Sequence, residues 1–234
     1  MKNTIYTTVA LFIAFLGMHT SASAQSVFTD GSIDYKIEIE SPEAMAGMIA
    51  FGAGAKVSFK GNLSKMTAML MGGAINMDMV ANNKAKKGVT LLNMMGQKKA
   101  VQLSKGDFSK VEAREIDTKN IEYTKETKKI AGYTCQKAIA KDAQTGEEMI
   151  LYLCKKIKPK SEGFMQNLLG SLDGFPLGME IKSGEHKVKV MATNINQSAP
   201  SKSIFNMTIP EGYEKVSMKD IEKQFIQQGE QFRQ

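Results

Sequence analysis

The sequence predicts one α+β domain built on a largely antiparallel β-sheet with a few short helices. Three patterns lead to this class: strict alternation of apolar and polar residues over 32–40, two matching segments on either side of the glycines at 72–73, and further hairpin patterns within 133–193. Alternation with a period of two indicates strands with one buried face, and short glycine turns join antiparallel neighbours. No internal repeat or linker interrupts the pattern, so residues 25–234 are expected to form a single domain.

The first 24 residues are typical of a secretory signal peptide. Lys2 precedes an apolar run from Val9 to Met18, and small residues then lead to an Ala-x-Ala site that ends at Ala24. The run is too short for a membrane-spanning helix, which needs about 20 apolar residues. We expect cleavage after Ala24 and a periplasmic or secreted mature protein. No cysteine follows the apolar run at this site, so a lipid anchor is not expected.

The mature chain is expected to begin with a strand, a short helix and a second strand. The alternating segment 32–40 forms the first strand. Ser41-Pro42-Glu43 then supplies a helix cap, a first-turn proline and a first-turn acid for a helix that ends near the glycines at 52 and 54. Val57 and Phe59 begin the next alternating strand.

The most informative segment is a hairpin whose two strands, 64–71 and 74–80, flank Gly72-Gly73. A two-residue turn fixes which residues face each other across the hairpin. One face is then wholly apolar and half methionine. The predicted facing pairs on it are Leu70 with Ile75, Ala68 with Met77, and Met66 with Met79.

The remaining elements are a hairpin over 89–103, a polar stretch over 107–128, a short helix over 161–172, a hairpin over 177–193, a strand over 204–209 and a final helix from Ser217. Phe164, Leu168 and Leu169 lie on one side of the helix over 161–172. Around the turn at Ser183-Gly184, Met179 is expected to face Val188.

Two cysteines remain after cleavage, and a hairpin pattern brings them together. The segments 133–141 and 148–155 flank a four-residue loop, which places Lys141 opposite Glu148 and Cys135 opposite Cys154. Directly opposed cysteines can be close enough for an S–S bond, and the compartment outside the cytoplasm is oxidising. A structural Cys135–Cys154 disulfide is the favoured interpretation, and two buried thiols are the alternative.

Charge and motif content favour binding over catalysis. The formal net charge is +7, and the lysines occur in short clumps such as 84–87, 98–99 and 155–160, which we interpret as solvated loops rather than a nucleic-acid site. His186 is the one histidine left after cleavage, and no common catalytic or metal-binding motif is present. We therefore expect no enzyme activity, no metal, no cofactor and no nucleic-acid partner.

Methionine is the compositional anomaly. Fifteen methionines remain after cleavage, and nine of them lie between Met45 and Met95. They can be flexible core fillers, or line an apolar site that adapts to ligands of variable shape. A third possibility is that Met66, Met69 and Met71 bind Cu(I) through their thioethers, since soft sulfur ligands select this ion.

Two segments resemble known secreted proteins. Lys-Lys-Ile-Ala-Gly-Tyr-Thr-Cys-Gln-Lys-Ala at 128–138 resembles a motif of the bacterial GLPGLI-type proteins and of the family called domain of unknown function 4412. The segment 203–213 resembles the strand and Pro-x-Gly-Tyr ending of that family and of lipoprotein-sorting carriers (LolA-like proteins). The Gly-Leu-Pro-Gly-Leu-Ile stretch itself is missing. Residues 173–178 stand in its place, which favours the domain of unknown function 4412.

The resemblance implies a LolA-like half-barrel, an incomplete β-barrel wrapped around helices, whose apolar concavity accepts acyl chains in the carriers. The implied function is non-catalytic binding or carriage of lipid or lipoprotein acyl chains. The alternative is an envelope module that packs solidly and binds a protein partner. Candidate cavity walls are Met66, Ala68, Leu70, Ile75, Met77, Met79, Phe164, Leu168 and Leu169.

Overall fold

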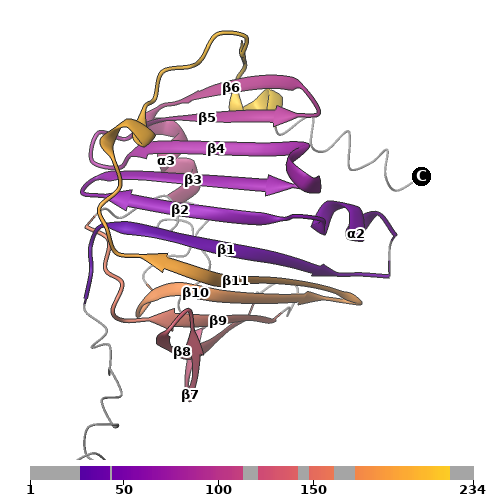
Figure 1. Cartoon of the computed structure of the whole chain (residues 1–234), viewed down its shortest axis with the longest axis vertical. Helices are drawn as coiled ribbons and strands as arrows, with labels where there is room; N and C mark the ends of the chain where they lie inside the picture. Colours follow the sequence, from indigo (N-terminus) through magenta and orange to yellow (C-terminus); the bar gives the residue numbers. More distant parts are fainter. Residues whose placement is uncertain (1–26, 43, 113–120, 142–147, 161–171, 222–234) are drawn as a thin grey trace, which may run out of the picture.

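The computed structural model describes residues 27–42, 44–112, 121–141, 148–160 and 172–221 (Figure 1). The predicted signal peptide and the predicted helix side chains at Phe164, Leu168 and Leu169 lie outside these ranges. Within the ranges, twelve strands form one sheet in the order β12-β6-β5-β4-β3-β2-β1-β11-β10-β9-β8-β7.

The strands are β1 (Gly31–Glu40), β2 (Gly54–Lys60), β3 (Leu63–Leu70), β4 (Ile75–Asn82), β5 (Lys87–Met94), β6 (Gln97–Leu103), β7 (Ile121–Ile130), β8 (Tyr133–Lys141), β9 (Glu148–Cys154), β10 (Phe175–Ser183), β11 (His186–Asn196) and β12 (Glu214–Lys215). The helices are α2 (Ala44–Ala50) and α3 (Lys105–Glu112), with 3-10 turns η1 (Met71–Gly73) and η3 (Lys202–Phe205). No helix in the described ranges is both long and apolar enough to cross a membrane.

The sheet is antiparallel except at one edge, where the short β12 runs parallel to β6. β1 lies in the middle and pairs with β2 on one side and β11 on the other, so the two halves of the chain meet there. The strands at the two edges, β12 and β7, do not pair with each other, and the sheet remains open. This confirms an open, mostly antiparallel sheet. The predicted α+β class is corrected, because the helices of the described residues are few and short and the fold is nearer all-β.

Glycine at the turn between β3 and β4 allows the predicted hairpin. Gly72 and Gly73 have φ of +62° and +93°, which side chains with a β-carbon rarely adopt. The predicted register is confirmed, because Leu70 pairs with Ile75, Ala68 with Met77 and Met66 with Met79.

The hairpin that contains both cysteines also has the predicted register. Lys141 pairs with Glu148 and Ile139 with Ile150 across β8 and β9. The ladder runs to Gln136 and Leu153, so the next position along each strand is a cysteine. The connection at 142–147 lies outside the described residues.

The expected strand over 204–209 is wrong. Ser201 accepts a hydrogen bond from the Ser203 N–H through its side chain and begins the 3-10 turn η3 instead. The following residues cross the sheet rather than joining it. Phe205, Met207 and Ile209 pack there on Val80 and Val89.

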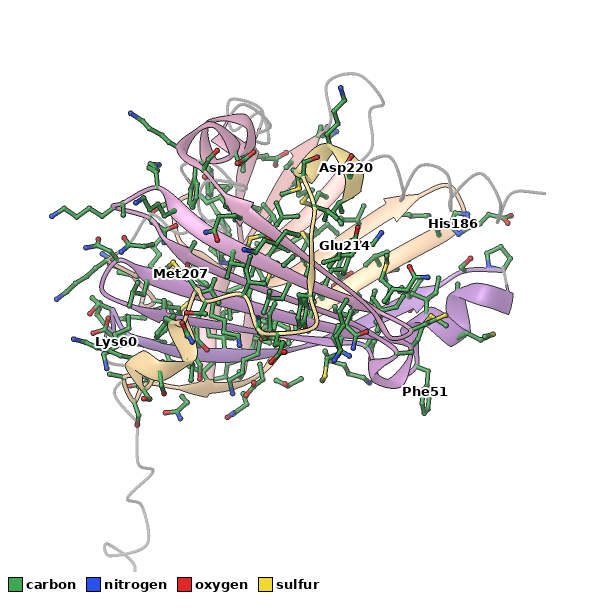
Figure 2. All side chains as sticks on the ribbon, turned by 90° about the horizontal axis from the view of Figure 1, so that it is seen from above. Phe51, Lys60, His186, Met207, Glu214 and Asp220 are labelled. Atoms are coloured by element: carbon green, nitrogen blue, oxygen red, sulfur yellow. The ribbon has the colours of Figure 1, made fainter. Side chains whose placement is uncertain are left out.

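The segment after η3 passes from one side of the sheet to the other. In Figure 2 it runs from Met207 past Glu214 to Asp220, which lies on the same side as α3. There Ser217 and Asp220 cap the last helix reciprocally, with the Asp220 N–H donating to Ser217 Oγ (3.2 Å) and the Ser217 N–H donating to Asp220 Oδ2 (3.0 Å). This confirms the predicted start of that helix.

Candidate ligand-binding face

Six of the predicted cavity residues come together on one face of the β3–β4 hairpin. We call this the methionine face and define it as Met66, Ala68, Leu70, Ile75, Met77 and Met79. Residues directly opposite each other in antiparallel strands lie on the same face, so the registers extend this face to both sides. Val57 of β2 lies beside Met66, and Leu92 of β5 lies beside Met77.

The same apolar face continues across the middle of the sheet. Ile37 of β1 pairs with Val190 of β11, which pairs with Met179 of β10. Met179 in turn pairs with Leu151 of β9. The apolar surface therefore crosses most strands between β5 and β9, far beyond the single hairpin that the sequence indicated.

The methionine face is covered unevenly. At one end, Phe108 of α3 packs on Met79 together with Val101 and Leu103, and Met79 is buried. The other five residues of the face are only partly buried. The face is thus closed beside α3 and more open towards Leu70 and Ile75.

Two polar side chains interrupt this face on β5 and β6. Thr90 pairs with Met79 on one side and Val101 on the other, and Lys99 pairs with Leu92. Both side chains are buried. The sequence interpretation placed Lys99 in a solvated loop, which is wrong. Lys99 lies two residues before Val101 in the sequence, and this spacing was the signal that the two side chains share one buried face.

The three methionines considered for Cu(I) do not form one site. Met66 pairs with Met79 on the methionine face, whereas Met69 pairs with Asn76 and therefore lies on the opposite face. Met69 is 45% exposed. Met71 follows the strand in the turn η1. A single ion cannot contact Met66 and Met69 from opposite sides of the sheet.

The cysteines lie in the largest core cluster, beside Ile33, Tyr35 and Leu177. Cys135 and Cys154 are both free thiols and fully buried, so their disulfide remains a prediction. A hydrogen bond between them raises the pKa of Cys135 and, together with nearby backbone groups, lowers that of Cys154 to about 7. Burial raises the pKa of Tyr35, whose hydroxyl donates to the Pro176 carbonyl at 2.9 Å.

A polar pocket lies at the tip of the β10–β11 hairpin and differs from the methionine face. It has a volume of about 820 Å³, and charged residues dominate its lining. In this pocket Glu180 Oε2 forms an ion pair with Lys187 Nζ at 3.5 Å, and His186 Nδ1 lies 2.8 Å from Ser41 Oγ. His186 begins a strand beside a turn at the surface, as the sequence predicted.

Comparisons with known proteins assign no family to this chain. No protein-family model matches the sequence, and no curated protein matches it. The resemblance to the domain of unknown function 4412 therefore remains a prediction.

Three solved structures illustrate the distant backbone similarities that do exist. A structure of PNGF-II in space group C2 has 13% identity and a TM-score of 0.47, over 83% of this chain and 32% of that one, so this chain spans about a third of PNGF-II. The lipoprotein LppX of Mycobacterium tuberculosis has 11% identity and a TM-score of 0.39, over 76% and 94% of the two chains. LprF from Mycobacterium bovis has 13% identity and a TM-score of 0.35, over 81% and 93%. Similarities of this size carry no conclusion about function.

Proposed function

We propose that this chain is a non-catalytic protein that works in the periplasm or outside the cell and binds the acyl chain of a lipid or lipoprotein on its methionine face. The observation that carries the proposal is a continuous apolar face on which five of six defining residues are only partly buried. Covering apolar surface stabilises a complex by roughly 25 cal/mol for each Å² removed from water. A flexible hydrocarbon chain is a ligand that can cover such a face.

The choice of side chain supports a chain-like ligand of variable shape. Methionine is unbranched and polarisable, and it adapts its conformation to irregular partners. Three of the six residues of the face are methionines: Met66 lies directly opposite Met79, and Met77 lies opposite the small Ala68. The resemblance of the sequence to lipoprotein-sorting carriers supports the same class of ligand.

The test compares two substitutions in one hairpin. Met77→Gln places an amide on the methionine face, and Met69→Gln places the same amide on the opposite face. Native mass spectrometry after gentle purification should show co-purifying lipid with the wild-type protein and Met69→Gln, and little or none with Met77→Gln. A lipid-free wild-type protein, or equal retention by both variants, would contradict the proposal.

A protein-binding role is the second candidate, and exposed apolar side chains favour it. Phe51, Met48 and Met95 are 73%, 58% and 70% exposed in segments that flank the turn η1. Backbone hydrogen bonds join both segments to the region of η1. The Gly72 N–H donates to the Phe51 carbonyl (2.7 Å), and the Met95 N–H donates to the Ala74 carbonyl (2.8 Å). In this case Phe51→Ser with Met95→Ser should abolish a reproducible pull-down partner while leaving lipid retention unchanged. No partner in the wild-type pull-down would remove this candidate.

A further inference from the structure

A lysine lies on the same side of the sheet as the methionine face. Lys99 of β6 pairs with Leu92 of β5, which pairs with Met77 of β4, so the three residues form one row across the sheet. Lys99 as a whole residue is only 9% exposed. Its ammonium nitrogen is not among the buried, unpartnered polar atoms of the described residues, so the apolar stem is covered while the ammonium still reaches water.

No ion pair or side-chain hydrogen bond joins Lys99 to any residue in the described part of the chain. Glu214 is its neighbour in the β12 ladder, but that side chain is exposed. The adjacent Lys98 behaves differently, since it is exposed and lies over the Tyr213 ring at 6.0 Å.

A second polar group lies close to Lys99 on the same face. Thr90 pairs with Val101, two residues along β6 from Lys99, so the two side chains are diagonal neighbours. Such neighbours are about 7–8 Å apart, within reach of a long side chain. The Thr90 hydroxyl is buried and has no hydrogen-bond partner among the described residues. A buried, unsatisfied hydroxyl costs about 1–3 kcal/mol unless something binds it.

We infer that Lys99 and Thr90 bind the anionic head group of the ligand, a carboxylate or a phosphate, while its hydrocarbon chain lies across the methionine face. This inference rests on the proposed function. An ammonium and a hydroxyl are the donors that such a group needs, and charge-assisted hydrogen bonds are stronger than neutral ones. The ligand is therefore an amphiphile with a charged end, such as a fatty acid or a lysophospholipid, rather than a neutral oil.

The row of residues also sets the direction of the chain. From Lys99 the row continues through Leu92, Met77 and Ala68 to Ala55 on β2. Four strand spacings separate β6 from β2, which is roughly 19 Å at about 4.8 Å for each spacing. A long acyl chain anchored at Lys99 would run across the strands along this row.

The test measures how much the head group contributes to affinity. A fluorescent fatty acid, its methyl ester and a chain-matched alkyl phosphate are titrated into the mature protein. The acid should bind about tenfold to a hundredfold more tightly than the uncharged ester, as expected for one charge-assisted hydrogen-bonded contact. The phosphate arm shows which of the two anions the site prefers.

Lys99→Met should bind the acid and the ester equally, with the ester affinity unchanged, and Lys99→Gln provides a second variant if the first does not fold. Thr90→Val should lose a smaller part of the preference, about fivefold. Lys98→Met is the matched control and should keep the wild-type preference. Equal binding of acid and ester by the wild-type protein would overturn the head-group inference alone. Loss of preference in Lys98→Met would also overturn it, and failure of all three ligands to bind would overturn the proposed function.

Discussion

The two faces of the β3–β5 region are built from the same strands but are closed in different ways. On one face, Phe205 and its neighbours after η3 pack on Val80 and Val89, and all three are buried. We call this the covered face. On the methionine face, Phe108 closes the end at Met79, and Met66 packs against the core cluster that contains Val57 and Phe59. The covered face is completed by the protein's own chain, whereas most of the methionine face stays partly open.

Both faces carry polar residues. On the covered face, Lys65 pairs with Val80 on one side and with the buried Ser58 on the other. Next to the methionine face lie the buried Lys99 and the buried hydroxyl of Thr90. A core that is closed by its own chain gains nothing from unpaired polar groups, because each costs free energy. The Thr90 hydroxyl is one of two buried polar atoms without a hydrogen-bond partner among the described residues, the other being Asn83 Oδ1, and the proposed head-group site uses the Thr90 hydroxyl.

The largest effect should come from opening the covered face. Phe205 is 5% exposed, and Phe205→Ala should reduce the free energy of unfolding by about 3–5 kcal/mol, because it removes a buried ring and leaves a cavity. Urea denaturation measures the loss. Ile204→Ala, at a side chain that is 37% exposed in the same turn, is the control and should cost far less. Equal losses would mean that η3 does not close this face.

The next effect concerns the core beside the methionine face, where the cysteine pair lies. Oxidation of Cys135 and Cys154 to a disulfide should raise the free energy of unfolding by about 3 kcal/mol, because it closes the loop between these two residues in the unfolded chain. The comparison is between oxidised protein and a Cys135→Ser, Cys154→Ser double variant. Mass spectrometry under non-reducing conditions should show the loss of two hydrogens, and its absence in protein secreted to the periplasm would reject the disulfide.

A smaller effect is expected from stiffening the methionine face. Met66→Leu with Met77→Leu conserves volume, so the free energy of unfolding should change by less than about 1.5 kcal/mol for each site. Leucine is branched and less adaptable than methionine. A panel of fatty acids should therefore show a narrower range of bound chain lengths in the double variant. An unchanged range would mean that methionine is only a core filler here.

The smallest effect lies on the polar face of β1, where Lys36 Nζ contacts Glu38 Oε1 at 2.8 Å. The hydrogen bond and charge of Lys36 lower the pKa of the exposed Glu38 carboxyl. A lowered folded-state pKa stabilises the protein above the unfolded pKa, and this contribution is lost as the pH falls through the folded value. The unfolding midpoint of the wild-type protein should therefore fall slightly as the pH is lowered into the acidic range, and Glu38→Gln should reduce this fall. A midpoint curve identical to that of the wild type would show that the pair contributes nothing.

Local patterns in the sequence predicted the methionine face well. Glycines at 72 and 73 fixed the turn, and the turn fixed the pairs from Met66 to Ile75. The predicted register of the β10–β11 hairpin is wrong, because Ser183 pairs with His186 and the turn residues are Gly184 and Glu185 rather than Ser183 and Gly184. Met179 therefore faces Val190 rather than Val188, a shift of two residues that keeps each side chain on its expected face.

Contacts between distant segments could not be predicted in the same way. The segment after η3 has the alternation of a strand, but it packs on the covered face, because Val80 and Val89 offer an apolar surface there. The burial of Lys99 depends on its rows with Leu92 and Val101 and on the neighbouring β12. β7 was missed because its residues are mostly polar on both sides.

That polar β7 has a consequence for how molecules of this protein meet one another. An open sheet has edges whose free N–H and C=O groups can pair with another chain and start aggregation. β7 is the last strand in the described sheet, and its irregular pairing between Tyr123 and Thr127 and its exposed charges, such as Lys125 and Lys129, make it a poor template for a foreign strand. Exposed charges and irregular pairing are features that protect an edge strand from pairing with another sheet, so the β7 edge is expected to resist edge-to-edge association of two molecules.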